Sequence, residues 1–364
     1  TLAHNINTFV FPPVDRLHQE GAVPDAVYEK IQTLALITGF KYEQLIYGFS
    51  TVLNELQQAG IEVLLVKGIV IRKIYPYPEY RSMGDIDILV HKEQLDKTDE
   101  ILKNYGYICE SSTEIHWVYT NPRMLDIEVH WTLTKELYIK STKFLEDNVW
   151  ERTTPVTVCN VPAMTLRREE HLIYLLLHMA GHFVSTGFGL RQIIDIALFV
   201  KTIDKTADWD TINSLIQKCS MERFSKAVFY ICQKYFGIEL PEEFSDFTDE
   251  EKRYSESLLE DVFISGTFGR RTKNGRMISG ITRDEEQVKL TNQFVCYLNK
   301  LFPGKEKISD QYKILNKYPV LLPFIWIRRM VESLFHKELT IRDTMVQSAE
   351  YKRRARLIQW LKIK

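Results

Sequence analysis

The stretch RSMGDIDILV, residues 81–90, decides the fold class. After the turn-forming Gly84, apolar residues occupy every second position, and Asp85 and Asp87 stand between them. Residues two apart on a strand point to the same face of a sheet. The stretch therefore predicts a strand that buries its apolar face and projects two neighbouring carboxylates from the other.

The flanking residues predict further elements of an α/β unit. IEVLLVKG (61–68) is a buried strand that ends in a turn, and a short helix should follow it until Pro76 and Pro78. Residues 92–105 form a charged helix with Gly106 after its end. Helical spacing between Pro24 and Ala59 predicts two opening helices.

A hairpin should follow. IHWVYT (115–120) and MLDIEVHW (124–131) flank a turn-like Asn-Pro-Arg joint and predict two antiparallel strands added to the same sheet. The alternation in the second strand sets Asp126, Glu128 and His130 on one face.

Beyond about residue 165 the spacing is helical to the end of the chain. We therefore expect an α/β (α+β) fold: a small mixed-sheet core with N-terminal helices and a large C-terminal helical domain. The expected division is an N-terminal helical segment at 1–40, a catalytic domain at 41–150 and a helical domain at 165–364, with a linker near TTPVTVCNVPAM (153–164).

Composition excludes several classes of protein. Of 364 residues, 45% are hydrophobic and 26% charged, as in globular proteins, and the net charge of -1 gives no reason to expect nucleic acid as a partner. Five cysteines without CxxC spacing predict a reducing, cytoplasmic location. The longest apolar run, VLLPFIWI (320–327), is too short to span a membrane. The oligomeric state stays open.

Paired carboxylates on one strand face call for a counter-charge, and Mg²⁺ with oxygen ligands is the natural candidate. A third carboxylate from the neighbouring strand would complete a site for in-line phosphoryl or nucleotidyl transfer. The structural alternative is a solvated strand start, where a turn glycine and acidic residues are common.

Other catalytic arrangements have little support. No GxSxG or GxxxxGK[ST] segment is present. His178 and His182 share a helix face and could bind zinc, but they lack the glutamate of HExxH and an obvious third ligand. They are better explained by lining a cleft between the domains, or by contact with the helix that carries Arg191 and Asp195. The basic tail YKRRARLIQWLKIK is better explained by a terminal helix packing Leu357, Trp360 and Leu361 on the core than by RNA or membrane binding.

The block LLVKGIVIRKIYPYPEYRSMGDIDILV with the later DIEVHW strand resembles the nucleotidyltransferase superfamily, specifically the bacterial family labelled uncharacterised nucleotidyltransferase. Its pattern is a Lys-Gly turn, an Arg before a Gly-Asp-x-Asp strand, and an acidic residue two before His-Trp. The resemblance continues through HLIYLLLHMAGHF, RQIIDIAL and LFPGKEKISDQYKILNKYP (301–319).

The resemblance implies a metal-dependent enzyme that moves an NMP from an NTP, such as ATP, to a hydroxyl of a small-molecule or protein acceptor, with Mg²⁺ (or Mn²⁺) as cofactor. It implies Asp85, Asp87 and Glu128 as catalytic and metal-binding acids, with Lys67 and Gly68 at the nucleotide phosphates. Arg81 and Ser82, beside Gly84, could add charge and hydroxyl contacts to the phosphates. The candidate residues of the substrate cleft are His130, His178, His182 and Arg191.

Two departures from the superfamily pattern leave alternatives open. Gly68 is followed by Ile69 rather than by a second Gly or Ser, and the third acid is Glu128 with Asp126 as a rival on the same face. A binding protein that keeps the fold but has lost catalysis is therefore the alternative function.

Overall fold

The structure is a computed structural model that describes residue 6 and residues 8–113, 115–133, 142–185, 187–203, 205–265, 321–335 and 353–363. The quoted segment 301–319 lies outside these residues.

A single mixed sheet forms the centre of the described chain. Its strand order is β3-β4-β5-β2-β1-β7-β6, so β2 lies inside the sheet between a parallel partner, β5, and an antiparallel one, β1. The strands are β1 (Val63–Val66), β2 (Asp85–Val90), β3 (Ile108–Ser112), β4 (His116–Thr120), β5 (Asp126–His130), β6 (Thr153–Val158) and β7 (Val161–Leu166). The predicted mixed α/β class is confirmed.

Local elements around the sheet also follow the predictions. The segment after β1 is helical as α3 (Gly68–Ile71) and η2 (Arg72–Ile74), and it ends before Pro76. The predicted hairpin is β4 and β5, which pair antiparallel. Helix α4 (Leu95–Asn104), preceded by η4 (Lys92–Gln94), ends just before Gly106, whose φ of +78° suits the chain reversal.

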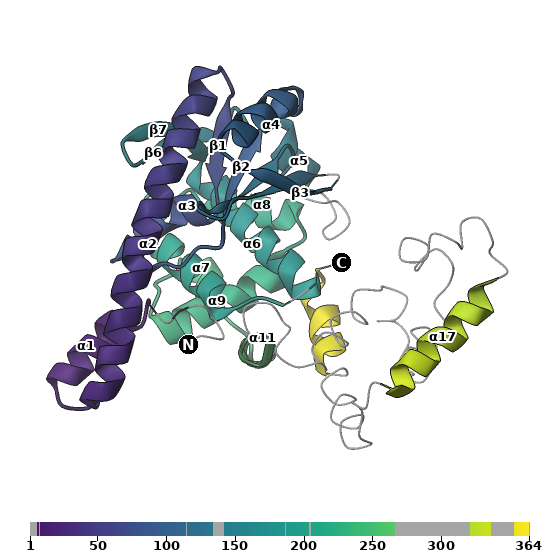
Figure 1. Ribbon diagram of the computed structural model, residues 1–364. Coiled ribbons are helices and arrows are strands. Elements are labelled where there is room, and N and C mark those ends of the chain that lie inside the picture. The colour runs from purple at the N-terminus through teal and green to yellow at the C-terminus, as the bar shows by residue number, and fades with distance from the viewer. Residues whose placement is uncertain are drawn as a thin grey trace.

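The prediction of two opening helices between Pro24 and Ala59 was wrong, because one helix, α2 (Asp25–Gln58), spans this range after α1 (Phe11–Gln19). Gly39 was compatible with a break, since glycine in a helix interior costs about 1 kcal/mol. The helix continues through this glycine, against which η3 (Pro78–Tyr80) packs, and a Cβ there would lie 3.5 Å from atoms of Glu79. Helix α2 runs along one side of the molecule (Figure 1).

Residues 153–164 are not a linker. They form most of the β6–β7 hairpin, which joins the sheet because β7 pairs parallel with β1. Cys159 and Asn160, at φ 44° and 66°, make the two-residue turn with the positive φ angles that tight hairpins need. Pro155 is tolerated because β6 is an edge strand. The sequence alone predicted a linker here, whereas pairing with β1 imposes a strand.

Hydrophobic residues pack on both faces of the sheet. The cluster on one face joins α2 and α4 to inward residues of β1, β2 and β5, including Phe49 and Ile88. On the other face, Leu89 of β2 belongs to a smaller cluster with Tyr174 of α6 (Arg168–Ser185). The carboxylate side of β2 therefore faces a helix rather than open solvent.

A helical layer lies beyond α6 (Figure 1). Its core includes residues of α6, α7, α8, α9 and α11 together with Leu357, Trp360 and Leu361, which confirms that the basic tail packs on the core. Residues 353–361 are helical. The helices after the hairpins are α5 (Lys143–Asp147), α6 (Arg168–Ser185), α7 (Leu190–Ile203), α8 (Trp209–Lys218), α9 (Glu222–Phe236), α10 (Glu242–Ser245), α11 (Asp249–Ser265) and α17 (Leu322–Phe335).

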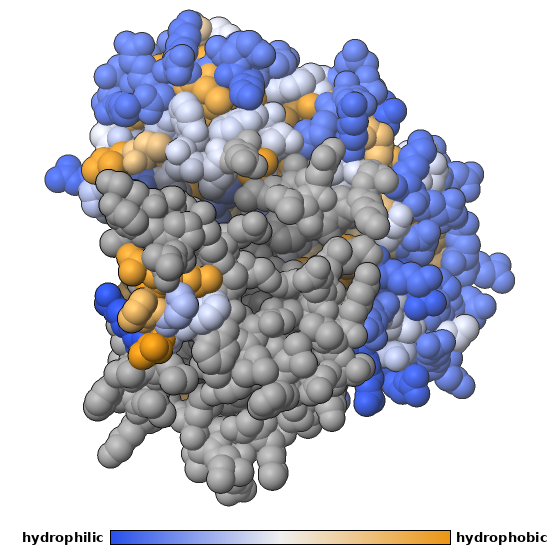
Figure 2. Space-filling view, turned by 90° about the vertical axis from the view of Figure 1, so that its right-hand side faces the viewer, coloured by the Kyte–Doolittle hydropathy of each residue, from blue (hydrophilic) through white to orange (hydrophobic). Residues whose placement is uncertain are grey.

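The described surface is mainly hydrophilic on the face drawn in Figure 2, with hydrophobic residues in scattered patches. Among the described residues, no helix combines the length and apolar character needed to cross a bilayer.

Candidate active site

The strand alternation of β2 places Asp85 and Asp87 on the face opposite the main core. Ile86 and Ile88 are fully buried in the cluster with α2, as expected. Asp87 is also buried, at 4% exposure, so its carboxylate sits inside the protein on the α6 side. A buried carboxylate needs compensating charge or hydrogen bonds.

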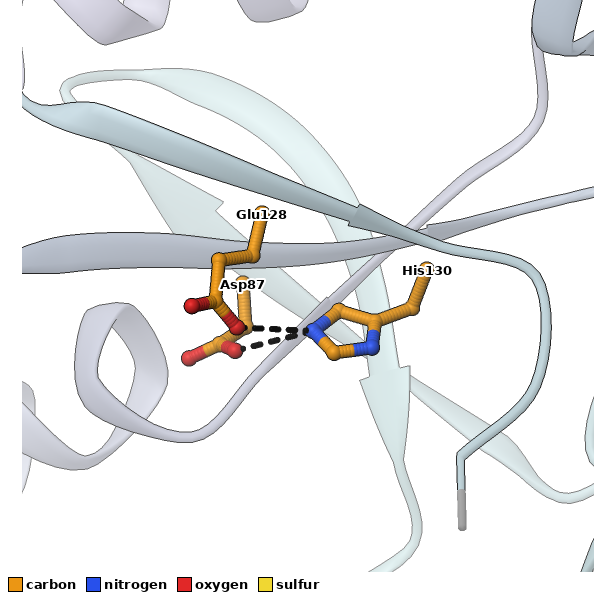
Figure 3. A group of neighbouring side chains, drawn as sticks. All are labelled: Asp87, Glu128 and His130. Atoms are coloured by element: carbon orange, nitrogen blue, oxygen red, sulfur yellow. Dashed lines mark hydrogen bonds and ion pairs between the residues drawn. The ribbon is translucent and has the colours of Figure 1, made fainter. Parts of the chain in front are cut away.

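Strand β5 supplies a second carboxylate next to Asp87. The two strands are parallel and in register, with Asp87 opposite Glu128 and Asp85 opposite Asp126. His130 follows on the same face of β5. Its Nε2 lies 3.1 Å from Asp87 Oδ1 and 3.3 Å from Glu128 Oε2, so the imidazole bridges the two acids (Figure 3).

Lys67 completes this buried group from the end of β1. Its Nζ lies 2.6 Å from Asp87 Oδ1 and 5.8 Å from the centre of the Tyr174 ring. Burial alone would lower the pKa of Lys67, but the charges of Asp87 and other neighbours, Glu128 among them, outweigh burial and raise it. Burial opposes ionisation of Asp87 as well, yet Lys67 and His130 hold its pKa well below the ordinary value.

Asp85 differs from Asp87 in its surroundings. Burial, with repulsion from Asp87 and Glu128, raises the pKa of Asp85 to about 6, although Lys67 and Arg191 act in the opposite direction. For Glu128, burial is offset by the hydrogen bond with His130, and the pKa is lowered. Asp87 and Glu128 therefore favour the charged form, and Asp85 favours it less.

The donor set fits a divalent cation. Asp87, Glu128 and His130 each offer one ligand atom, and these atoms lie within 4.8 Å of one another. Two carboxylate oxygens and an imidazole nitrogen suit Mg²⁺ or Mn²⁺, with the nitrogen favouring the latter. Asp85, the other acid of the predicted metal pair, is outside this trio.

Contacts within the protein fix the turn between β1 and α3. A Cβ at Gly68 would lie 3.0 Å from Nη1 of Arg81, so glycine leaves room for this guanidinium. Arg81 donates through Nε and Nη2 to the two oxygens of Asp195 on α7, at 2.8 and 2.7 Å. Tyr75 donates to the same carboxylate at 2.6 Å. Arg81 thus joins the turn to the helical layer.

Ser82, Gly84 and Arg191 lie around the start of β2. Arg191 donates from Nη1 to the carbonyl oxygen of Ser82 at 2.8 Å. Gly84 lines a cleft of about 280 Å³ that also contains Asp126, Lys41 and other residues of α2 and the β4–β5 turn. Asp126 therefore belongs to this cleft, and Glu128 is the acid of β5 that contacts the His130 and Asp87 group.

His178 and His182 face each other on α6, with their Nε2 atoms 2.9 Å apart. Burial lowers the pKa of both, to about 4 for His182, so each is neutral near pH 7. In the parts of the chain that the structure describes, they are not members of any three-ligand metal group. The charges of Lys67 and Asp87 act on His178, as expected of a side chain near the acids.

Comparison with known protein families identifies the family of the chain. A protein-family model described as uncharacterised nucleotidyltransferase matches residues 2–237. The chain belongs to this family. The match confirms the resemblance inferred from residues 67–131, and it classes the protein as a nucleotidyltransferase.

Solved structures match the chain only at low TM-score. The match with the solution structure of the antibiotic-resistance factor ANT(2'')-Ia has 10% identity and a TM-score of 0.35. It covers 47% of this chain and 88% of that chain. A nucleotidyltransferase-like protein from Paracoccidioides brasiliensis has 14% identity, a TM-score of 0.31, and coverage of 48% and 88%. A tRNA nucleotidyltransferase solved with a primer tRNA and an incoming ATP analogue has 12% identity, a TM-score of 0.28, and coverage of 85% and 97%.

These TM-scores are low, and the family match alone carries the assignment. No curated protein matches the chain.

Two residues of this nucleotidyltransferase site were missed at the level of sequence. His171 accepts a hydrogen bond from the backbone N–H of Lys67 at 3.3 Å, and Tyr174 lies beneath the Lys67 ammonium. Both lie on α6 together with His178 and His182. Their spacing of three and four residues in an otherwise apolar helix was the available signal, because such positions share one helix face.

Proposed function

We propose that this nucleotidyltransferase moves a nucleoside monophosphate from an NTP to a hydroxyl of its acceptor and requires a divalent cation. The observation that carries the proposal is the pairing of Asp87 with Glu128 on adjacent parallel strands, with Lys67 and His130 against them. Such a cluster places both negative and positive groups where a metal-bound triphosphate would need them.

The acids have separate roles in this proposal. Asp87 and Glu128 hold the cation, and Asp85 stands beside them as a further ligand. When bound, Mg²⁺ (or Mn²⁺) neutralises phosphate oxygens and lowers the pKa of an attacking hydroxyl. The Glu128 side chain is 26% exposed, against 6% for Asp87, so Glu128 is the acid better able to meet an acceptor and take its proton.

The phosphates would bind at the turn after β1. Lys67 supplies the positive charge of this turn, and Gly68, Ser82 and Gly84 are the proposed phosphate contacts. Arg81 is already paired with Asp195, so its main contribution is to hold the turn in place. We divide the roles in this way because the bidentate contact of Arg81 with Asp195 is strong and leaves few donors of the guanidinium free for a phosphate.

The acceptor would enter from the side of α6 and α7. His178, His182 and Arg191 belong to these helices, and a small molecule or a protein hydroxyl fits a site without a strong basic surface better than nucleic acid does. For the catalytic domain, expected at 41–150, we add the whole of α2 and the β6–β7 hairpin, and we assign the helices from α6 onward to the domain that covers the acceptor.

The buried thiols support a reducing compartment for this reaction. Cys219 and Cys232 are free and buried in the helical core. We place the protein in the cytoplasm on this ground.

Isothermal titration with each of the four NTPs, with and without MgCl₂, tests the proposal. Metal-dependent binding of one NTP, lost in Asp87→Asn and kept in Asp126→Asn, is the expected result. Pyrophosphate release on adding candidate acceptors would then separate an active transferase from a protein that only binds nucleotide. Binding that needs no metal, or that survives Asp87→Asn, contradicts the assignment of the acids.

A further inference from the structure

The ammonium of Lys67 is paired with a carboxylate oxygen of the proposed metal site. Its Nζ is 2.6 Å from Oδ1 of Asp87, and Nε2 of His130 is 3.1 Å from the same oxygen. The side chains are 11% and 6% exposed for Lys67 and Asp87. A cation ligated through Asp87 Oδ1 and this ammonium therefore compete for one oxygen.

The position of Lys67 is built into the fold. Its backbone has φ 54° and ψ -128°, a conformation that non-glycine residues rarely adopt. Helix α6 supports it twice, because the Lys67 N–H donates to His171 and the ammonium lies over Tyr174. A strained conformation that the surroundings maintain is often part of a functional device.

Displacement of Lys67 by a cation alone would be unfavourable. The ammonium would lose its closest partner while still surrounded by protein, and an unpaired buried charge is costly. The phosphates of a nucleotide would remove this cost, because they offer the ammonium new anionic oxygens.

We propose that Lys67 couples metal binding to nucleotide binding: its ammonium neutralises Asp87 until a divalent cation arrives with an NTP, and then moves from Asp87 Oδ1 to the phosphates. The inference rests on the proposed function and adds that the affinity for the metal depends on the nucleotide. The metal binds weakly by itself and tightly as a complex with the nucleotide.

The first test measures MnCl₂ binding, without nucleotide, by isothermal titration of the full chain. Lys67→Gln removes the competing charge and keeps a hydrogen-bond donor, so we expect its Kd for Mn²⁺ to be at least tenfold lower than that of the wild type. At saturating Mn²⁺, non-hydrolysable analogues of the four NTPs should bind the variant at least tenfold more weakly. Lys73→Gln is the matched control, because Lys73 is exposed on η2, and it should change neither Kd.

A second test uses only the wild type and so does not depend on the folding of a variant. Acetylation of lysines with acetic anhydride, followed by mass spectrometry, reports whether Lys67 is paired. We expect its modification to rise at MnCl₂ concentrations that saturate the site, and to fall again when the bound NTP analogue is added. Lys73 should be modified to the same extent in all three samples.

The outcomes separate this inference from the function beneath it. An unchanged or weaker Mn²⁺ affinity in Lys67→Gln, or a Lys67 acetylation level that Mn²⁺ does not alter, overturns the coupling while metal-dependent NTP binding by the wild type still supports the transferase. Failure of the wild type to bind any NTP analogue with Mn²⁺ overturns the proposed function and the coupling together.

Discussion

Lys67 and Asp87 form a buried ion pair, with Nζ and Oδ1 2.6 Å apart, that joins the end of β1 to the middle of β2. The two strands are antiparallel neighbours, and Asp87 is in register with Val66, the residue before Lys67. Sheet pairing therefore brings the Lys-Gly turn against the Gly-Asp-x-Asp strand, although the two residues are 20 positions apart.

Replacement of the two acids on β5 should show whether Glu128 or Asp126 is the third acid of the site. Glu128→Gln is expected to weaken metal-dependent NTP binding at least tenfold, because it removes a charged ligand next to Asp87 and His130. Asp126→Asn should change binding less than threefold, since Asp126 lines the cleft near α2. The measurement is isothermal titration in MgCl₂, and the reverse ranking would make Asp126 the third acid.

A methyl group at Gly68 should disturb the turn. In Gly68→Ala the new Cβ would stand 3.0 Å from Arg81 Nη1, and this guanidinium is held by two hydrogen bonds to Asp195. We expect a loss of about 1–2 kcal/mol in the free energy of unfolding, as for other overpacked sites. Gly84→Ala is the control, because nothing lies within 4 Å of its Cβ. Equal urea midpoints for the two variants would contradict the close contact.

Acid should destabilise the protein through His171. Burial lowers the pKa of His171 to about 4 from an ordinary 6.5. Below pH 6.5 the unfolded chain takes up a proton that the folded His171 does not, so the contribution of His171 to stability is constant above this pH and falls as the pH drops towards 4. The shift corresponds to a loss of about 3 kcal/mol.

The measurement is urea unfolding of the wild type and His171→Gln between pH 4 and 8. The glutamine can still accept from the Lys67 N–H but cannot titrate, so its stability should depend less on pH in this window. Because the pKa of His182 is also lowered to about 4, part of the dependence should remain in the variant. Parallel curves of stability against pH for the two proteins would show that His171 takes up no proton when the chain unfolds.

The C-terminal helix should contribute to the stability of the helical layer. Leu361 is fully buried among residues of α6, α7, α9 and α11, so Leu361→Ala is expected to cost about 2–5 kcal/mol. Arg356→Ala, on the exposed side of the same helix, should cost less than about 0.5 kcal/mol. Thermal unfolding measures both, and a small effect of Leu361→Ala would show that this helix packs loosely.

Local sequence determined β1, β2, β4 and β5, and the faces of β2 and β5. The period of two in DIDILV and DIEVH is sufficient to separate buried Ile and Val from carboxylates, because alternate side chains on a strand point to opposite faces. Gly106 and Pro76 likewise marked the ends of elements. The family resemblance, carried by the same short segments, was confirmed over residues 2–237.

Tertiary structure alone decided which groups meet. Pairing with β1 made strands of residues 153–158 and 161–166, where the sequence predicted a linker, and α2 continued through Gly39, against which η3 packs. The ion pair of Lys67 with Asp87, the contact of Arg81 with Asp195 and the hydrogen bond from Lys67 to His171 join residues 20, 114 and 104 positions apart. Periodicity reports only the face on which a side chain lies, whereas such contacts depend on the register of strands and the docking of helices, which are long-range properties of the folded chain.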